Sequence, residues 1–213
     1  MATGDYIDLP TLKSYLGITQ PTWDTLLATA ITSASRAVDR YCQRRFWLDS
    51  VPVARTFIPD TLLDLNLGPG NDIGSTTSFA VATDPEGDGT FQISWNYPAD
   101  IQLLPSNAPT AVPEAKPWTA LRAVGTKTFP WLINTWLTHL DRIQVTALWG
   151  WPEVPSDVIS ATLIKAARLY MRKDAVNGIA GYGDFGPVRL SKGEDSDVIS
   201  LLFGYQYSPI LVG

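Results

Sequence analysis

The stretch between Pro21 and Phe46 constrains the fold most, because it has the pattern of one long amphipathic helix with an alanine-rich apolar side. Apolar residues recur there at intervals of three and four, which places them on one stripe of a helix. The stripe consists of Leu27, Ala30, Ile31, Ala34, Ala37, Val38, Tyr41 and Cys42. Small side chains let a second helix approach closely, and such a stripe is stable only when it is buried. The stretch therefore predicts a core helix that needs a partner helix from elsewhere in the chain.

A second helical pattern near the other end of the sequence supplies this partner. It opens at Ser156, a favourable N-cap residue that follows Pro155. Its apolar stripe consists of Ile159, Leu163, Ala166, Ala167 and Tyr170. Shorter helices are predicted from Asp8 to Ile18, capped by Asp8 and ended by Gly17, and from Asp195 to Phe203, ended by Gly204.

The residues between these two long helices have a different character, with short apolar runs separated by glycine, proline and asparagine. Seven runs are typical of strands: VPVARTFI, TLLDLNL, SFAVAT, FQISW, DIQLL, WTALRAV and RIQVTALW. The stretch TFPWLINTWLTHLD is compatible with a loop, a strand pair or a short helix. Seven short strands joined by turns favour an antiparallel sandwich or barrel.

The sequence thus predicts an α+β fold, in which a helical frame is interrupted by an inserted β domain. The frame would hold two long antiparallel helices and the short N- and C-terminal helices. We expect its two halves at residues 1–47 and 152–204, the inserted antiparallel β-sandwich or barrel at residues 48–151, and an extended tail at residues 205–213.

The chain has 213 residues and a formal net charge of −5, which is unusual for a protein that grips nucleic-acid phosphates. Its single cysteine excludes an internal disulfide bond and fits a reducing compartment. The N-terminus lacks a signal-peptide pattern, and no apolar run is long enough to span a bilayer. We expect a soluble protein that is made in a cytoplasm.

No set of residues predicts catalysis. His139 is the only histidine, so a Ser/His/Asp or Cys/His site would have to use it, and a structural or surface role is favoured. Cys42 lies on the apolar stripe of the long helix and is expected to be a core residue rather than a nucleophile. No metal-ligand spacing of cysteine and histidine is present. The chain is therefore predicted not to be an enzyme and to use no cofactor.

Gly181, Gly183 and Gly186 match the dinucleotide-binding pattern G-x-G-x-x-G. That pattern needs a strand before it and a helix after it, whereas here a helix precedes it and Pro187 follows. The surrounding stretch GIAGYGDFGPVRLSKG has too much glycine for regular structure, so a mobile loop is favoured over a cofactor site.

Asp84, Glu86, Asp88 and Gly89 resemble the beginning of a calcium-binding loop. Position twelve of an EF-hand would be Trp95 instead of the required glutamate, and no flanking helices are expected. A hairpin turn is favoured, with weak calcium binding left as the alternative.

Two residue clusters have a structural and a functional interpretation. Tryptophans in or just after the β region could stack on sugars, but filling a small core or an oligomer interface is favoured. These are Trp95, Trp118, Trp131, Trp136, Trp149 and Trp151. Basic residues could cluster where the two long helices end and contact DNA or an acidic neighbour, although solvated helix ends explain them adequately. These are Arg44, Arg45, Arg168, Arg172 and Lys173.

The order of these segments resembles the head–tail connector adaptors of tailed bacteriophages, the group related to the HK97 and SPP1 connector proteins. Three stretches carry the resemblance. They are LPTLKSYLGI with WDTLLATAITSASRAVDRYCQRRF, then WGWPEVPSDVISATLIKAARLYMRKDA, and finally the glycine-rich loop with the last short helix and its apolar tail. Together they cover the first 46 residues and roughly residues 149–213. The inserted β region is larger and richer in tryptophan than in the smallest members of the family.

The resemblance implies a structural virion protein that is assembled in the host bacterial cytoplasm and forms a homo-oligomeric ring, a dodecamer, under the portal protein. The ring would extend the channel for genomic DNA without binding it specifically and would connect to the next neck, head-completion or tail protein. The portal-docking segment would be Tyr205, Gln206, Tyr207, Ser208, Pro209, Ile210 and Leu211. A loop that orders on assembly would include Gly178, Gly181, Gly183, Gly186, Arg189 and Lys192. The alternative function is a glycan-binding β module on a helical stalk.

Overall fold

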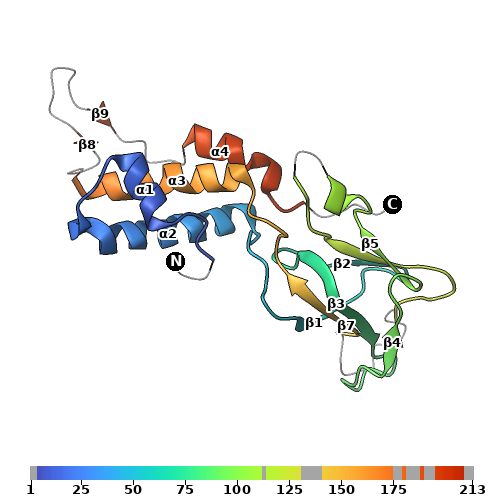
Figure 1. The fold of residues 1–213 in the computed structure, drawn as a ribbon. Coiled ribbons are helices and arrows are strands. Elements are labelled where there is room, and N and C mark those ends of the chain that lie inside the picture. Colours follow the sequence, from blue (N-terminus) through green and yellow to red (C-terminus); the bar gives the residue numbers. More distant parts are fainter. Residues whose placement is uncertain are drawn as a thin grey trace. The chain divides into compact units, whose positions relative to one another are not determined.

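The computed structural model describes residues 4–111, 114–130, 141–174, 179–180, 188–189 and 195–208. The chain forms two compact units, and the elements of each are labelled in Figure 1. The helical unit consists of Met1–Phe46 and Val154–Gln206, and the β unit consists of Trp47–Glu153 and Tyr207–Gly213. Helices and antiparallel sheets both occur, so the predicted α+β class is confirmed.

The helical unit is built on α2 (Asp24–Cys42) and α3 (Ser156–Met171), which lie side by side (Figure 1). They run antiparallel, since the ammonium group of Lys173 just after α3 lies 4.4 Å from the ring centroid of Trp23 just before α2. Their predicted apolar stripes meet in one buried cluster. Its buried members are Ile7, Leu12, Leu27, Ile31, Ala34, Ala166 and Ala167. The predicted pairing of two distant alanine-bearing helices is therefore confirmed.

Two short helices complete this unit. In α1 (Leu9–Leu16) the Asp8 side chain accepts a hydrogen bond from Thr11 N at 2.9 Å, and Gly17 ends the helix in the left-handed region, as predicted. In α4 (Ser196–Leu202) the Asp195 carboxylate is the N-cap and also pairs with Arg168 of α3 at 2.8 Å. This ion pair fastens α4 to α3.

Several predicted helix ends were wrong. The long helix was predicted from Pro21 to Phe46, but Pro21–Trp23 is a 3-10 turn and α2 ends at Cys42, because Gln43 takes a left-handed conformation with φ 54°. The N-cap of α3 is Pro155, and Ser156 is already helical. Gly204 does not stop α4, since a 3-10 turn over Phe203–Tyr205 continues the chain.

The β unit contains two antiparallel sheets at the positions of the seven predicted runs. The first has the order β1 (Val53–Phe57), β7 (Ile143–Trp149), β3 (Ile73–Thr83), β4 (Ile93–Trp95). The second has the order β2 (Asp64–Asn66), β6 (Ala120–Ala123), β5 (Ile101–Leu104). A bridge between Ile73 and Trp118 joins the two sheets. Strand β3 begins earlier than predicted, within the stretch LGPGNDIG that was expected to be a turn.

Both sheets contribute to one core because each strand turns alternate residues inward. Strand β7 shows this directly, with Ile143, Val145, Ala147 and Trp149 fully buried and the residues between them half-buried. The second sheet adds Leu65, Ile101, Leu103 and Leu121. Within the part of the chain that the structure describes, no helix is both long and apolar enough to cross a lipid bilayer.

Candidate interface surfaces

The predicted docking segment begins inside the helical unit. The ring of Tyr205 meets Phe46 edge-on at a centroid distance of 5.9 Å, and its hydroxyl donates to Asp157 Oδ2 at 3.3 Å. Gln206 and Ser208 are exposed and Tyr207 is half-buried. The remaining predicted docking residues, Pro209, Ile210 and Leu211, lie outside the described residues. Tyr205 therefore serves as an anchor, and within the predicted docking segment only the residues after it stay candidates for docking.

Phe46 is the residue on which the ring of Tyr205 packs. It is fully buried, and the ring of Tyr6 near the N-terminus packs on it edge-on at a centroid distance of 5.9 Å. The Phe46 backbone N–H donates to the Tyr6 hydroxyl at 2.9 Å, and this hydroxyl donates in turn to Asp39 of α2. Burial and the contact with Asp39 raise the pKa of Tyr6 well above its usual value, and burial also raises the pKa of Asp39. The Tyr6 phenol thus stays protonated and keeps both hydrogen bonds.

Replacing Phe46 by alanine is expected to lower the free energy of unfolding of the helical unit by about 3–5 kcal/mol, the cost of removing a buried aromatic ring. The variant loses the contacts with both Tyr6 and Tyr205, so the start of the C-terminal segment should also become accessible to protease. Chemical denaturation followed by circular dichroism measures the first effect and limited proteolysis the second. Phe46→Leu, which keeps most of the apolar volume, should cost less than half as much. Equal stability of Phe46→Ala and the natural chain would contradict this role.

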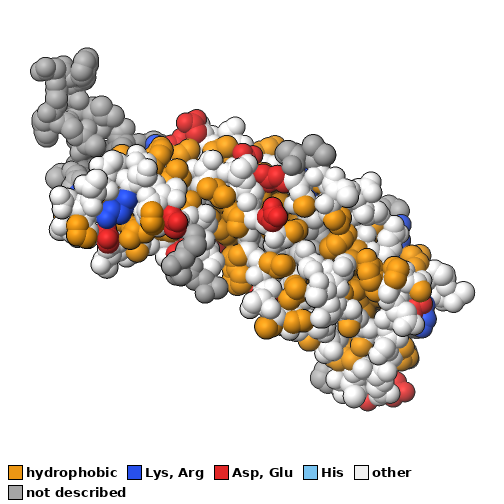
Figure 2. All heavy atoms as spheres, viewed as in Figure 1, with side chains coloured by type: hydrophobic (Ala, Val, Ile, Leu, Met, Phe, Trp, Pro, Cys, Tyr) orange, Lys and Arg blue, Asp and Glu red, His pale blue; other side chains and the backbone are white. Residues whose placement is uncertain are grey.

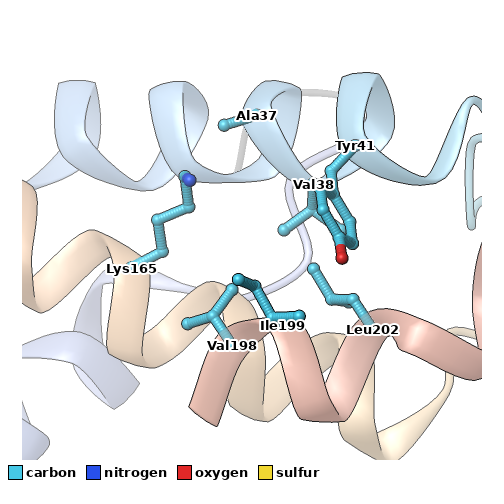
Figure 3. Close-up of a pocket in the computed structure, with 7 residues that line it drawn as sticks. All are labelled: Ala37, Val38, Tyr41, Lys165, Val198, Ile199 and Leu202. Atoms are coloured by element: carbon cyan, nitrogen blue, oxygen red, sulfur yellow. The ribbon is translucent and has the colours of Figure 1, made fainter. Parts of the chain in front are cut away.

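Helix α4 is followed by an exposed aromatic residue that precedes the docking segment. Val198 and Leu202 are buried, whereas Ile199 is 38 % exposed and Phe203 is 73 % exposed. In Figure 3, Val38 and Tyr41 of α2 point toward Ile199 and Leu202, and the crevice between them leaves no space for a water molecule. Ile199 therefore belongs to the side of α4 that packs on α2, and Phe203 is the large apolar side chain that stays exposed.

Sequence reasoning recognised Phe203 only as an apolar member of the last helix. A signal was present, because Ile199 and Phe203 are spaced at i and i+4 while Val198 and Leu202 repeat the same spacing one residue earlier. Two adjacent apolar stripes on so short a helix form a wider apolar surface than a single neighbouring element can bury, so part of this surface stays exposed. In the view of Figure 2, hydrophobic side chains are spread over the visible surface, and acidic side chains lie among them.

The predicted assembly loop is described only in part. Backbone residues Ile179–Ala180 (β8) and Val188–Arg189 (β9) form an antiparallel pair, so the prediction that this stretch lacks regular structure was wrong at these positions. Gly178, Gly181, Gly183, Gly186 and Lys192 lie outside the described residues.

The predicted basic cluster does not form. Arg44 and Arg45 follow the C-terminal end of α2, whereas Arg172 and Lys173 follow the end of α3, which lies beside the start of α2. Since α2 has 19 residues, about 28 Å of helix separates the two pairs. The prediction failed because antiparallel packing sends the two C-terminal ends to opposite ends of the unit.

In the β unit, the acidic stretch forms a hairpin turn between β3 and β4. The buried Asp84 carboxylate accepts hydrogen bonds from Gly87 N and Gly89 N, both at 2.7 Å, while Asp88 accepts one from Thr90 N at 2.8 Å. These bonds occupy both oxygens of Asp84 within the turn. Among the described residues, no three acidic, histidine or cysteine side chains are grouped so that they could hold a metal ion.

The tryptophans of the β unit mostly fill its core, as favoured from the sequence. Trp95, Trp149 and Trp151 are 7 %, 0 % and 2 % exposed. Trp118 is half-buried and lines a hollow of about 380 Å³ together with Tyr97. Trp131, Trp136 and His139 lie outside the described residues. A buried indole has no free face for a sugar, so among the described tryptophans of the β unit only the half-buried Trp47 and Trp118 are left for the alternative glycan-binding function.

Comparison with known proteins gives similarity in structure but not in sequence. No protein-family model matches the sequence, and no curated protein matches it. The neck of the native GTA particle computed with C12 symmetry contains a similar chain, with a TM-score of 0.56 and 16 % identity. The neck of the empty GTA particle computed with C6 symmetry contains another, with a TM-score of 0.58 and 16 % identity. A chain in the virion of the native gene transfer agent (GTA) particle gives a TM-score of 0.51 and 15 % identity. Each match covers 100 % of this chain and 95 % of the other. At these identities the similarity shows a shared fold.

Proposed function

We propose that this chain is a structural neck protein of a phage-like particle, a ring-forming adaptor that lies under the portal protein and joins it to the next neck or tail protein. The observation that carries the proposal is the match of the whole chain, both units included, to chains in GTA necks computed with C12 and C6 symmetry. Rotational symmetry of this kind is what a ring of identical subunits produces. The resemblance in sequence order to phage head–tail adaptors supports the same conclusion independently.

The adaptor acts by docking and not by chemistry. Phe203, the most exposed of the large hydrophobic side chains described, is separated by one glycine from Tyr205, whose ring packs on Phe46. The segment from Gln206 to Leu211 follows Tyr205 in the sequence. An exposed apolar side chain is stabilised when a partner buries it. We assign Phe203 and the segment from Gln206 to Leu211 to the portal protein.

The remaining features fit a conduit for DNA. The chain has a net charge of −5, and the basic residues that could have formed one cluster lie at opposite ends of the helical unit. Such a ring would let the genomic DNA pass without holding it, because tight binding requires many phosphate contacts. The glycine-rich segment that includes Gly178, Gly181, Gly183, Gly186, Arg189 and Lys192 is proposed to take its final shape on assembly, and the β unit to meet the next ring.

Co-expression with the portal protein of the same particle tests this function. We expect a complex in which a ring of this chain is stacked on the portal, visible by electron microscopy and with one stoichiometry by native mass spectrometry. The variant Phe203→Asp should weaken the complex, and Ser14→Asp, an exposed position on α1, should leave it intact. A chain that never co-purifies with portal and is absent from purified particles would refute the proposal.

A further inference from the structure

The segment Gly4–Ile7, which we call the N-terminal strap, is fastened along one stripe of α2. It forms hydrogen bonds with four α2 side chains at positions i, i+3, i+4 and i+7, which share one side of a helix. These side chains are Thr32, Ser35, Arg36 and Asp39. Within the strap, Tyr6 is 5 % exposed and Ile7 is 3 % exposed. The strap is therefore a packed part of the helical unit.

Tyr6 connects this strap to the segment that leaves α2. Its hydroxyl donates a hydrogen bond to the Asp39 carboxylate and accepts one from the Phe46 backbone N–H at 2.9 Å. Because α2 ends at Cys42, Phe46 is no longer held by helical hydrogen bonds, and the Tyr6 hydroxyl ties it back to the helix. The Tyr6 ring also packs edge-on against the Phe46 ring. The place of Phe46 thus depends on Tyr6.

The start of the predicted docking segment depends on the same residue. The ring of Tyr205 meets the ring of Phe46 edge-on at a centroid distance of 5.9 Å. The Tyr205 hydroxyl donates to Asp157 Oδ2 at 3.3 Å, which exceeds the usual range of about 2.5–3.0 Å for such a bond. The contact with Phe46 is therefore the firmer of these two supports, and a displaced Phe46 would release Tyr205.

We propose that Tyr6 is a positioning residue for docking to the portal protein. It fixes Phe46 through its hydroxyl and its ring, and Phe46 in turn fixes Tyr205, at which the docking segment begins. This inference rests on the proposed function, because that function names the portal protein as the partner of the segment. It goes further by giving residues near the N-terminus a role in a contact that residues near the C-terminus make.

The variant Tyr6→Phe tests the proposal, because it keeps the ring and removes the hydroxyl that holds Phe46. Its affinity for immobilised portal protein should fall about tenfold, as expected for the loss of one buried hydrogen-bonding group. In a chain that also carries Tyr205→Ala, the same substitution should cause no further loss, since no anchored ring is left to position. Full additivity of the two losses would contradict the contact chain.

A spin label on Gln206 reports the position of the docking segment without portal protein. Gln206 is exposed, so a nitroxide on Gln206→Cys is accessible. Cys42, the only natural cysteine, is not labelled, because it is fully buried and burial raises the pKa of its thiol to about 12. Introducing Tyr6→Phe should narrow the lines of the electron paramagnetic resonance spectrum, which indicates faster motion of the label.

Leu27→Val is the matched control for a general loss of stability. Leu27 is fully buried in the same helical unit, but about 18 Å of helix separates it from Asp39. It should lower the melting temperature to a similar extent as Tyr6→Phe and leave the affinity and the spectrum unchanged. Equal effects of Leu27→Val and Tyr6→Phe on affinity and spectrum would overturn the proposal.

Linkage adds a reciprocal test, since a contact that strengthens portal binding must itself be strengthened by portal. The Tyr6 N–H donates to Ser35 Oγ at 3.2 Å, and the Phe46 N–H donates to the Tyr6 hydroxyl. Hydrogen exchange of both amides should slow on portal binding by a larger factor than that of Ile18, whose N–H bonds to Lys13 O at 2.9 Å. Equal slowing at all three amides would contradict the coupling.

The outcome is separable from that of the proposed function, because the spin label is measured on the free chain. A label that Tyr6→Phe loosens, in a chain that never binds portal, supports the contact between strap and tail and refutes the neck role. Portal binding with unchanged affinity and an unchanged spectrum in Tyr6→Phe refutes the positioning role and leaves the neck role intact.

Discussion

Removal of residues 206–213 is expected to abolish binding to the portal protein while the helical unit stays folded. The deleted segment includes Ile210 and Leu211, and burial of two such side chains is worth about 3 kcal/mol or more. This corresponds to a loss of affinity of at least ~100-fold. Surface plasmon resonance against immobilised portal measures the affinity, and thermal unfolding followed by circular dichroism measures the stability.

The end point of the truncation matters, because Tyr205 belongs to the helical unit. A second variant that lacks residues 205–213 also loses the ring contact with Phe46 and the hydrogen bond to Asp157. It should therefore have a lower melting temperature than the first, although neither variant binds portal. Unchanged affinity of the chain that ends at Tyr205 would contradict the docking role of the tail.

Replacing Gly150 by alanine is expected to prevent the β unit from folding stably. Gly150 has φ +113°, a conformation that residues with a side chain rarely adopt. An added Cβ would lie 1.9 Å from the carbonyl oxygen of Trp47, a backbone atom that cannot rotate away. The hydrogen bond from Asp49 N to Trp149 O, 2.8 Å, holds the segment after Trp47 beside Gly150, and the bond from Gly150 N to Asp72 O, also 2.8 Å, fixes Gly150 from a third segment. The expected loss in the free energy of unfolding is about 4 kcal/mol or more.

Gly125→Ala is the matched control for this variant. Gly125 also has a positive φ, +71°, but no heavy atom lies within 4 Å of an added Cβ. Its substitution should cost only about 1 kcal/mol, from the backbone conformation alone. Near-ultraviolet circular dichroism reports on the β unit, since Trp149 and Trp151 are buried there. If both variants keep the natural spectrum and stability, the close approach at Gly150 is not required.

The helical unit could be predicted well because its signals are local and repetitive. The spacing of Leu27, Ile31 and Ala34 determines which side of α2 is buried, and the alanines in both long stripes indicate that the helices are partners. Asp8 and Gly17 predicted both ends of α1, because capping depends on a few neighbouring residues. The end of α2 could not be predicted in this way, since no sequence rule marks Gln43 for a left-handed conformation.

The candidate surfaces could be predicted only in part. The docking segment stays a prediction from the family resemblance and its apolar residues. The role of Tyr205 as an anchor could not be predicted, because it depends on Phe46 and Asp157, which are distant in the sequence. The exposure of Phe203 depends on how α4 packs on α2 and α3. The prediction of a basic cluster was wrong because it assumed that the C-terminal ends of the two long helices meet. Each of these features requires knowing which segments become neighbours.

The sequence by itself determined the α+β class, the seven strand positions and the pairing of two alanine-bearing helices, because hydrophobic periodicity and turn chemistry act within a few residues. Only the tertiary structure decided which apolar residues are left uncovered, where the basic helix ends lie and where a glycine has no room for a side chain. Phe203, Lys173 and Gly150 show this, since the surroundings of each are set by atoms far away along the chain. Burial and close approach depend on which residues become neighbours in space, and a sequence pattern does not give the distances between residues that are far apart along the chain.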